Sequence, residues 1–183
     1  VIRLNQVELN KNYALVITTN SGLWRYLIGD TIRFTSLSPY RIKVTGRTKH
    51  HINVFGEELM VENTDAAIAK TCALFDCEIV DYTVAPVFMS ETQKGSHEWI
   101  IEFKNPPEDV EKFSMILDEN IQSLNSDYEA KRYNNMTLNP LVLNVARKNL
   151  FYDWLKQNDK LGGQHKIPRL SNDRNYLESL LNL

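Results

Sequence analysis

The chain has 183 residues, of which 43% are hydrophobic and 24% charged, with a formal net charge of −2. These values are typical of a folded globular domain and exclude a disordered chain, a fibrous repeat and a disulfide-stapled miniprotein. The slightly acidic balance argues against a general nucleic-acid-binding protein, which is normally basic. No apolar run approaches the ~18 residues of a membrane-spanning helix. The sequence therefore predicts neither a nucleic-acid nor a membrane partner.

Cysteine content indicates the cellular compartment, and the distribution of charge indicates which part of the chain could bind an anionic ligand. Two cysteines, Cys72 and Cys77, do not make a disulfide framework, so we expect a reducing, cytoplasmic compartment. Residues 1–60 carry 8 Lys and Arg against 4 Asp and Glu, whereas residues 61–183 carry 13 against 19. A site for an anionic ligand is therefore favoured in the first third, although basic residues that keep strand edges soluble explain the excess equally well.

The first third reads as a run of short strands. We expect four of them, separated by turns such as Asn20–Gly22 and Gly29–Asp30, at residues 13–19, 23–28, 31–35 and 41–45. Short antiparallel strands of this kind form a meander or part of a small barrel, and the pattern ends at Gly46. The chain begins at Val1 and opens directly into this strand-like sequence. We expect a piece of a longer protein, although removal of a short tag explains the missing Met equally well.

The remaining sequence alternates helical and strand patterns. Helices are expected at 61–75, 106–124, 148–157 and 173–181, and strands at 78–88, 98–103 and 138–145. Asn63 or Thr64 is the expected N-cap of the first helix. The predicted fold class is α+β: the end of a β-barrel or meander, followed by a small antiparallel sheet with helices packed on one face.

Two short segments could carry chemistry. Asp30 follows Gly29 where a strand is expected to end. Its carboxylate could accept hydrogen bonds from two ribose hydroxyls. The alternative is an ordinary turn, because Gly-Asp is common in turns. In Arg47–His51, two cations and two imidazoles fall within five residues. Arg47 could hold a phosphate. A metal site at His50-His51 is disfavoured because neighbouring strand side chains point to opposite faces. The alternative is that both histidines are surface linker residues.

Three motifs in this order carry a resemblance to a known family. They are Tyr26-Leu27-Ile28-Gly29-Asp30, Gly46-Arg47, and Gln164-His165-Lys166-Ile167-Pro168-Arg169. The stretches at residues 22–26 and 54–60 make the match more specific than Gly-Asp alone. Over essentially its whole length, the chain resembles the C-terminal part of the Gretchen Hagen auxin-responsive family of acyl-acid amido synthetases, in its bacterial branch. That family belongs to the adenylate-forming superfamily.

The resemblance implies a two-step, AMP-forming ligase that uses ATP and Mg²⁺. A carboxylic acid would attack the ATP α-phosphate, and an amine or amino acid would then displace AMP from the acyl-adenylate. On this resemblance Asp30 holds the ATP ribose, with Tyr26, Gly29 and Arg47 also at the ATP site. Lys166 is the catalytic lysine of the adenylation step. No protein metal ligand is implied.

The resemblance also implies a domain organisation. Residues 1–46 would be the last strands of a large N-terminal adenylation domain, whose upstream part is a partner of this chain. Residues 47–183 would form a mobile C-terminal lid that turns about a hinge at 47–51. The chain by itself is then expected to be inactive. Arg169 is a rival to Lys166 for the phosphate role.

The chain departs from the family pattern at two positions, and one other function stays open. Leu27 stands where plant members usually have Arg, and His50 or its neighbour stands where the superfamily usually has Asp or Lys at the hinge. The alternative is a non-catalytic regulatory or protein-interaction module, with Trp24, Trp99 and Trp154 as core residues. The identities of the acid and of the amine are not encoded in these motifs.

Overall fold

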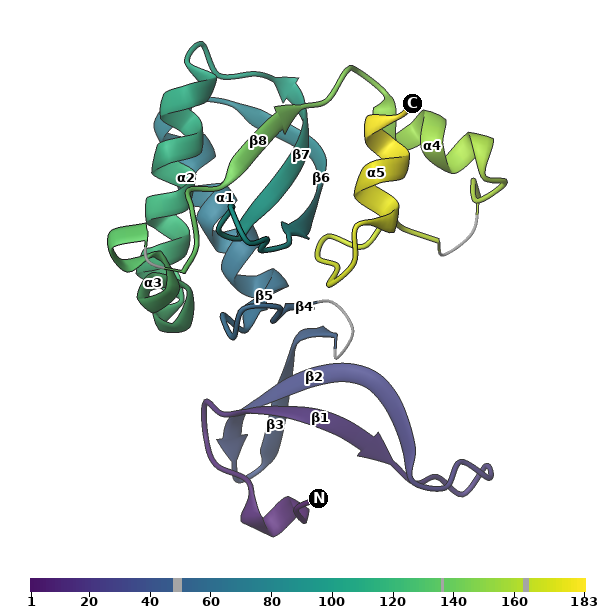
Figure 1. Cartoon of the computed structure of the whole chain (residues 1–183). Helices are drawn as coiled ribbons and strands as arrows, with labels where there is room; N and C mark the ends of the chain where they lie inside the picture. Colours follow the sequence, from purple (N-terminus) through teal and green to yellow (C-terminus); the bar gives the residue numbers. More distant parts are fainter. Residues whose placement is uncertain (48–50, 136, 163–164) are drawn as a thin grey trace. The chain divides into compact units, whose positions relative to one another are not determined.

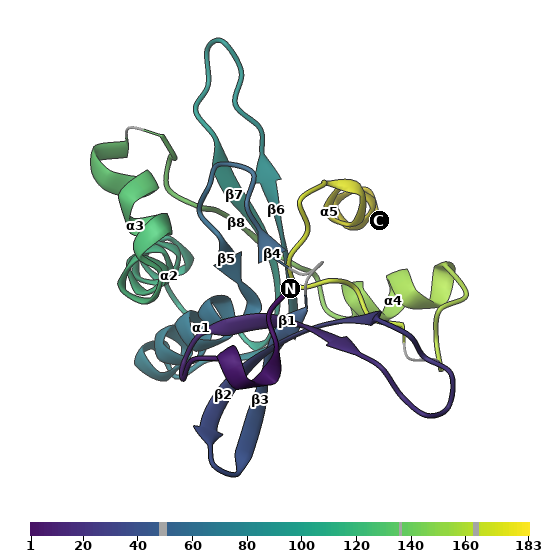
Figure 2. The same cartoon turned by 90° about the horizontal axis from the view of Figure 1, so that it is seen from below.

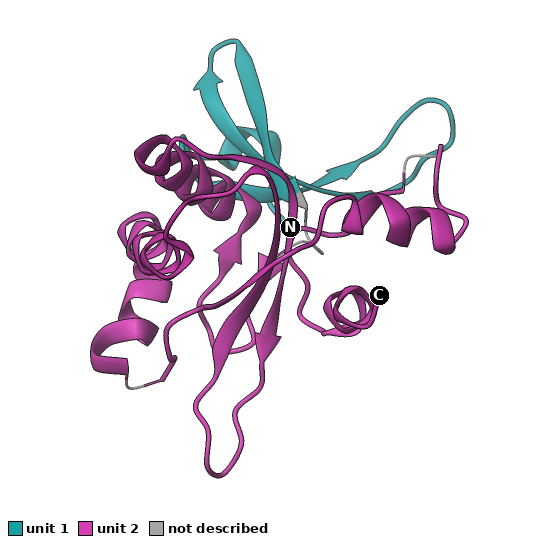
Figure 3. Cartoon of the chain, turned by 90° about the horizontal axis from the view of Figure 1, so that it is seen from above, with its two compact units in different colours: residues 1–50 teal, residues 51–183 magenta. Residues whose placement is uncertain are grey.

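The computed structural model describes residues 1–47, 51–135, 137–162 and 165–183. The chain divides into two compact units, Val1–His50 and His51–Leu183 (Figure 3). The first unit holds a three-stranded sheet, and the second holds a two-stranded and a three-stranded sheet. In the described part of the chain, no helix is both long and apolar enough to cross a lipid bilayer.

The first unit is an antiparallel meander (Figure 1). A short 3-10 helix, η1 (Leu4–Gln6), precedes β1 (Asn12–Ile17), β2 (Tyr26–Leu37) and β3 (Tyr40–Arg47). Residues 26–28 and 31–35 of the expected strands belong to one continuous strand, β2, so the prediction of a turn at Gly29–Asp30 was wrong. The chain passes this point as a bulge, because Gly29 takes a φ of 88° that side chains disfavour.

The core of the first unit is small and aromatic. Ile32 and Phe34 of β2 are buried, and the Phe34 ring meets Tyr13 and Tyr40 edge to face, with ring centroids 6.0 and 5.9 Å apart. Trp24 is 78% exposed. The expectation that Trp24 belongs to a core is therefore wrong for this unit taken by itself.

The second unit follows the expected α+β order with additions. It comprises β4 (His51–Ile52), β5 (Leu59–Met60), α1 (Val61–Phe75), β6 (Glu78–Val87), β7 (Ser96–Asn105), α2 (Val110–Leu124), α3 (Ser126–Arg132), η2 (Tyr133–Asn135), β8 (Val142–Val145), α4 (Leu150–Gln157) and α5 (Asn175–Leu181). Neither the β4–β5 hairpin nor α3 was expected. The N-cap of α1 is Met60 rather than Asn63 or Thr64, because Asn63 lies one turn inside and accepts a hydrogen bond from the Met60 N–H at 3.0 Å.

Helices cover both faces of the larger sheet (Figures 1 and 2). Trp99 and Ile101 of β7 belong to the buried cluster that includes α1 and α2 residues, whereas Ile100 packs with α4 and α5. The expectation of helices on one face was therefore wrong. Alternate residues of a strand point to opposite faces, and β7 is apolar on both. β6 and β7 are antiparallel as expected, whereas β8 joins β7 in parallel.

Candidate functional site

Asp30 lies in a bulged part of β2 rather than at a strand end. Val16 of β1 pairs with Leu27 and Ala14 with Thr31, so three β2 residues oppose one of β1. Asp30 is half-buried at this bulge, and Tyr26, four residues earlier, is 50% exposed. Bulges re-aim side chains and recur next to active sites. Gly29 and Asp30 thus form part of a bulge. The sequence does not distinguish this bulge from a hairpin turn, because both favour the same residues.

The structure places the backbones of two expected ATP-binding residues opposite each other. Asp30 of β2 and Arg47 of β3 are direct partners in the antiparallel ladder, although they are 17 residues apart in the sequence. The Arg47 side chain and residues 48–50, with His50 of the predicted hinge, lie outside the described residues. The first described residue after them, His51, opens β4 in the second unit.

Lys166 lies on a segment that is fixed along the edge of β6. The Val84 N–H donates to the Arg169 carbonyl at 2.8 Å, and the Ser171 N–H donates to the Val84 carbonyl at 3.1 Å. Two residues of this segment, Ile167 and Leu170, are buried in different hydrophobic clusters, whereas Lys166 is exposed. The role of Lys166 stays a prediction, because the described contacts hold the residues that follow it and not its own side chain. Gln164 of the expected motif lies outside the described residues.

The rival cation, Arg169, is already engaged by protein groups. Its Nη1 lies 2.6 and 2.7 Å from the two carboxylate oxygens of Asp65, and its guanidinium carbon lies 5.3 Å from the centre of the Tyr82 ring. Tyr82 also donates its hydroxyl to Asp65 at 2.6 Å. Burial and this carboxylate raise the pKa of Tyr82 well above its ordinary value, so the hydroxyl stays a donor.

An open pocket of about 410 Å³ adjoins Arg169, between α1 and β6. It is lined by Asp65, Ile68, Ala69, Cys72, Cys77, Glu78, Ile79, Tyr82 and Arg169. Burial raises the pKa of Cys72 to about 12, so its thiol is protonated near neutral pH and is a poor nucleophile. Among the described residues, no group of three or more His, Cys, Asp or Glu side chains could hold a metal ion.

Close to the Lys166 segment, Asp81 has an altered pKa. Burial raises the pKa of the Asp81 carboxyl, and the Tyr82 N–H and the positive charges of Arg169 and Lys166 offset only part of this effect.

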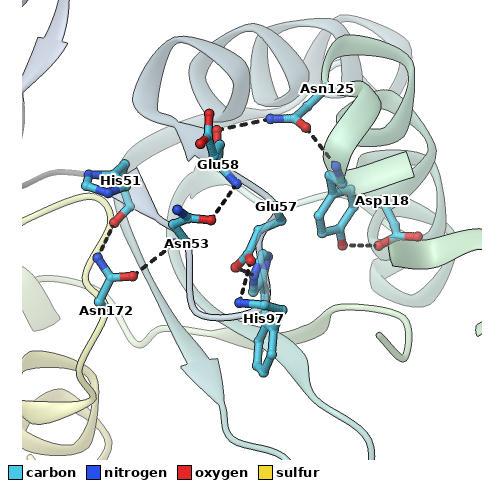
Figure 4. A network of polar contacts seen from close by, with 10 residues as sticks. His51, Asn53, Glu57, Glu58, His97, Asp118, Asn125 and Asn172 are labelled. Atoms are coloured by element: carbon cyan, nitrogen blue, oxygen red, sulfur yellow. Dashed lines mark hydrogen bonds and ion pairs between the residues drawn. The ribbon is translucent and has the colours of Figure 1, made fainter. Parts of the chain in front are cut away.

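The loop between β4 and β5 is held by a buried hydrogen bond between Glu57 and His97 (Figure 4). Glu57 Oε1 lies 2.9 Å from His97 Nε2, and both side chains are fully buried. Burial by itself raises the pKa of Glu57, but the hydrogen bond and charge of His97 and the Phe55 N–H outweigh it, and the pKa is lowered. Phe55 lies against Gly95, where a Cβ atom would stand 2.6 Å from its ring.

Reasoning from the sequence missed Glu57, His97 and Asn172. Asn172 donates to the His51 carbonyl at 2.7 Å and accepts from the Asn53 N–H at 2.9 Å. Glu57 was visible only as part of a Gly-Glu-Glu stretch. Nothing local marks His97 or Asn172, because their partners lie 40 and about 120 residues away.

Two family models match consecutive parts of the chain. The GH3 family central domain matches residues 1–47, and the GH3 family C-terminal domain matches residues 62–175. The second match alone covers more than half of the chain. The chain belongs to the GH3 family. Its α+β fold is accordingly that of the C-terminal region of a GH3 protein.

GH3 relatives are much longer than this chain. An indole-3-acetic acid-amido synthetase of Arabidopsis thaliana is 26% identical over 92% of this chain and 30% of its own length. A jasmonoyl-L-amino acid synthetase of Oryza sativa subsp. japonica is 25% identical over 95% of the chain and 31% of its own length. A solved GH3 acyl acid amido synthetase superposes with a TM-score of 0.78 at 22% identity, over 99% of this chain and 34% of its own. The chain thus spans about a third of these relatives.

Proposed function

We propose that this chain acts as the C-terminal third of an AMP-forming acyl-acid amido synthetase. The enzyme would adenylate a small carboxylic acid with ATP and pass the acyl group to an amine or amino acid. Membership of the GH3 family, whose matched relatives are named as amido synthetases, is the observation that carries the proposal. Bacterial origin and cytoplasmic location remain predictions.

We propose that each unit contributes its own residues to ATP binding. In the first unit, Asp30 would accept the ribose hydroxyls, the Gly29 bulge would admit the nucleotide close to the backbone, and Tyr26 and Arg47 would line it. In the second unit, Lys166 would place a positive charge on the phosphate oxygens as the acid attacks. Mg²⁺ would offset phosphate charge when bound. Its protein ligands are not proposed among the described residues.

A movable lid would let one chain serve both steps. We propose that residues 1–46 complete the large domain, whose upstream part is their partner, and that residues 47–183 turn about 47–51. The turn would bring Lys166 to the phosphates for adenylation and then exclude water from the acyl-adenylate. Without the upstream part, the chain is expected to be inactive.

Exchange of labelled pyrophosphate into ATP tests the proposed function. The full-length gene product is mixed with ATP, Mg²⁺ and a panel of small carboxylic acids that includes aryl-acetic and fatty acids. We expect exchange that depends on the acid, and AMP release with amide formation once amino acids are added. A complete lack of exchange across the panel would reject the ligase and favour a non-catalytic interaction module.

Asp30→Ala should raise the KM for ATP at least tenfold in the full-length protein. The lost contact is one charge-assisted hydrogen-bonding group, and tenfold corresponds to about 1.4 kcal/mol. Initial rates of adenylate formation at varied ATP give the value. Glu8→Ala is the matched control, because Glu8 is an exposed acid of the same unit that pairs with Lys11. Equal KM values for Asp30→Ala and the wild type would remove Asp30 from the nucleotide site.

A further inference from the structure

The segment that follows Lys166 bonds to two sheets at once. On one side its backbone pairs with β6, through the parallel bridge between Leu170 and Val84. Thr83 adds a side-chain hydrogen bond to the Pro168 carbonyl at 2.7 Å. On the other side it reaches β4 through a single side chain, that of Asn172 (Figure 4).

The Asn172 carboxamide takes the place of a peptide group beside β4. In a parallel ladder, a residue donates to the carbonyl before its partner and accepts from the N–H after it. Asn172 makes this pattern around Ile52, with Nδ2 donating to the His51 carbonyl at 2.7 Å and Oδ1 accepting from the Asn53 N–H at 2.9 Å. One side chain thus continues the backbone pairing from the larger sheet to β4.

The β4–β5 hairpin, which makes this contact, is held in the second unit by buried side chains and hydrogen bonds. Ile52 and Leu59 are fully buried in the cluster that contains α1 and α2 residues. The Glu58 N–H donates to Asn53 Oδ1 at 3.3 Å, and Asn125 donates to the Glu58 carbonyl at 3.2 Å. His51 and Asn53 are therefore fixed to the body of the second unit.

We propose that Asn172 is a positioning residue that couples the Lys166 segment to β4. His51 ends the proposed hinge at 47–51, and Lys166 stands six residues before Asn172. The two Asn172 hydrogen bonds hold the segment that carries Lys166 against the β4–β5 hairpin of the same unit. The catalytic part of this inference rests on the proposed function, whereas the coupling itself is a property of the fold.

Amide exchange measures the coupling without any catalysis. In the 183-residue chain, Asn172→Ala should speed exchange of the Asn53 N–H at least tenfold, as followed by NMR, because that N–H loses its acceptor. Asn172→Asp keeps an acceptor for Asn53 and loses the donor to His51, so its exchange should lie between the wild type and Asn172→Ala. Asn105→Ala is the matched control, since Asn105 also donates to a distant backbone carbonyl, that of Asp76 at 3.1 Å.

Steady-state kinetics then measure positioning in the full-length protein. Asn172→Ala should lower kcat for adenylate formation about five- to tenfold and leave the KM for ATP within twofold, because Lys166 is misplaced while the Asp30 contacts remain. Asn105→Ala should change neither value. A variant that was merely less stable would lose active protein at each ATP concentration, so activities are normalised to the folded fraction measured by circular dichroism.

The outcomes separate the two proposals. Unchanged Asn53 exchange in Asn172→Ala would refute the coupling. Faster exchange together with kinetics equal to those of Asn105→Ala would refute the positioning role. If the wild type catalyses no pyrophosphate exchange, the ligase proposal fails and takes the catalytic role with it, while Asn53 exchange alone still decides whether the coupling exists.

Discussion

Replacing Lys166 by alanine should slow adenylate formation at least a hundredfold in the full-length protein. This loss corresponds to roughly 3 kcal/mol of transition-state stabilisation, as expected when one preorganised charge is removed from a phosphoryl reaction. Amide formation from a preformed acyl-adenylate should fall much less, because negative charge no longer builds up on the ATP phosphates in that step. Pyrophosphate exchange measures the first step, and single-turnover amide formation measures the second.

Two further variants make the lysine test specific. Lys156→Ala, at an exposed lysine in the last turn of α4, should leave both steps unchanged. Arg169→Ala should slow adenylation less than Lys166→Ala, because Asp65 already takes both short contacts of Arg169 Nη1. Equal losses in both steps for Lys166→Ala would indicate a structural role. A larger loss for Arg169→Ala would transfer the phosphate role to that residue.

Asp118→Ala should lower the free energy of unfolding by about 3–5 kcal/mol, the typical cost of leaving a buried charge without its partner. Arg132 donates to the Asp118 carboxylate from Nε at 3.0 and 3.1 Å and from Nη2 at 2.7 Å. Both side chains are less than 10% exposed. Tyr128 donates to the same carboxylate at 2.6 Å, so the substitution also strands a buried hydroxyl.

Urea unfolding of the 183-residue chain, followed by a signal of the second unit such as Trp99 and Trp154 fluorescence, measures this loss. Asp153→Ala is the matched control, because the Arg147–Asp153 pair is 49% and 41% exposed and such pairs contribute about 0–1 kcal/mol. The double variant Asp118→Ala with Arg132→Met should be less destabilised than the sum of the single variants, since it removes the unpaired charge. A loss for Asp118→Ala no greater than that of Asp153→Ala would contradict the prediction.

Local patterns in the sequence predicted most of the elements. The helix at 61–75 was expected with the bounds that α1 has, and the strands expected at 78–88 and 98–103 correspond to β6 and β7. The family motifs also singled out Asp30, Arg47 and Lys166. Their proposed roles stay predictions. Asp30 and Arg47 lie in the first unit and Lys166 lies in the second, and each unit is described by itself.

The errors share a physical cause. Gly29-Asp30 was expected to end a strand, because a turn and a bulge use the same residues and only pairing with β1 and β3 distinguishes them. Helices were expected on one face of the sheet, because periodicity shows that a strand surface is apolar but not what covers it. Ile100 is apolar on the second face, and only the tertiary structure brings Leu150, Trp154 and Leu177 to it.

The sequence by itself determined the α+β class, the positions of α1, β6 and β7, and the motifs that place the chain among its relatives. These properties depend on neighbouring residues and on side-chain periodicity, which the sequence displays directly. The tertiary structure decided that Glu57 pairs with His97, that Asp65 engages Arg169, and that Asn172 bonds to His51 and Asn53. These contacts join residues 40 to 121 positions apart, and a polar side chain carries no local mark of a partner that only folding brings near.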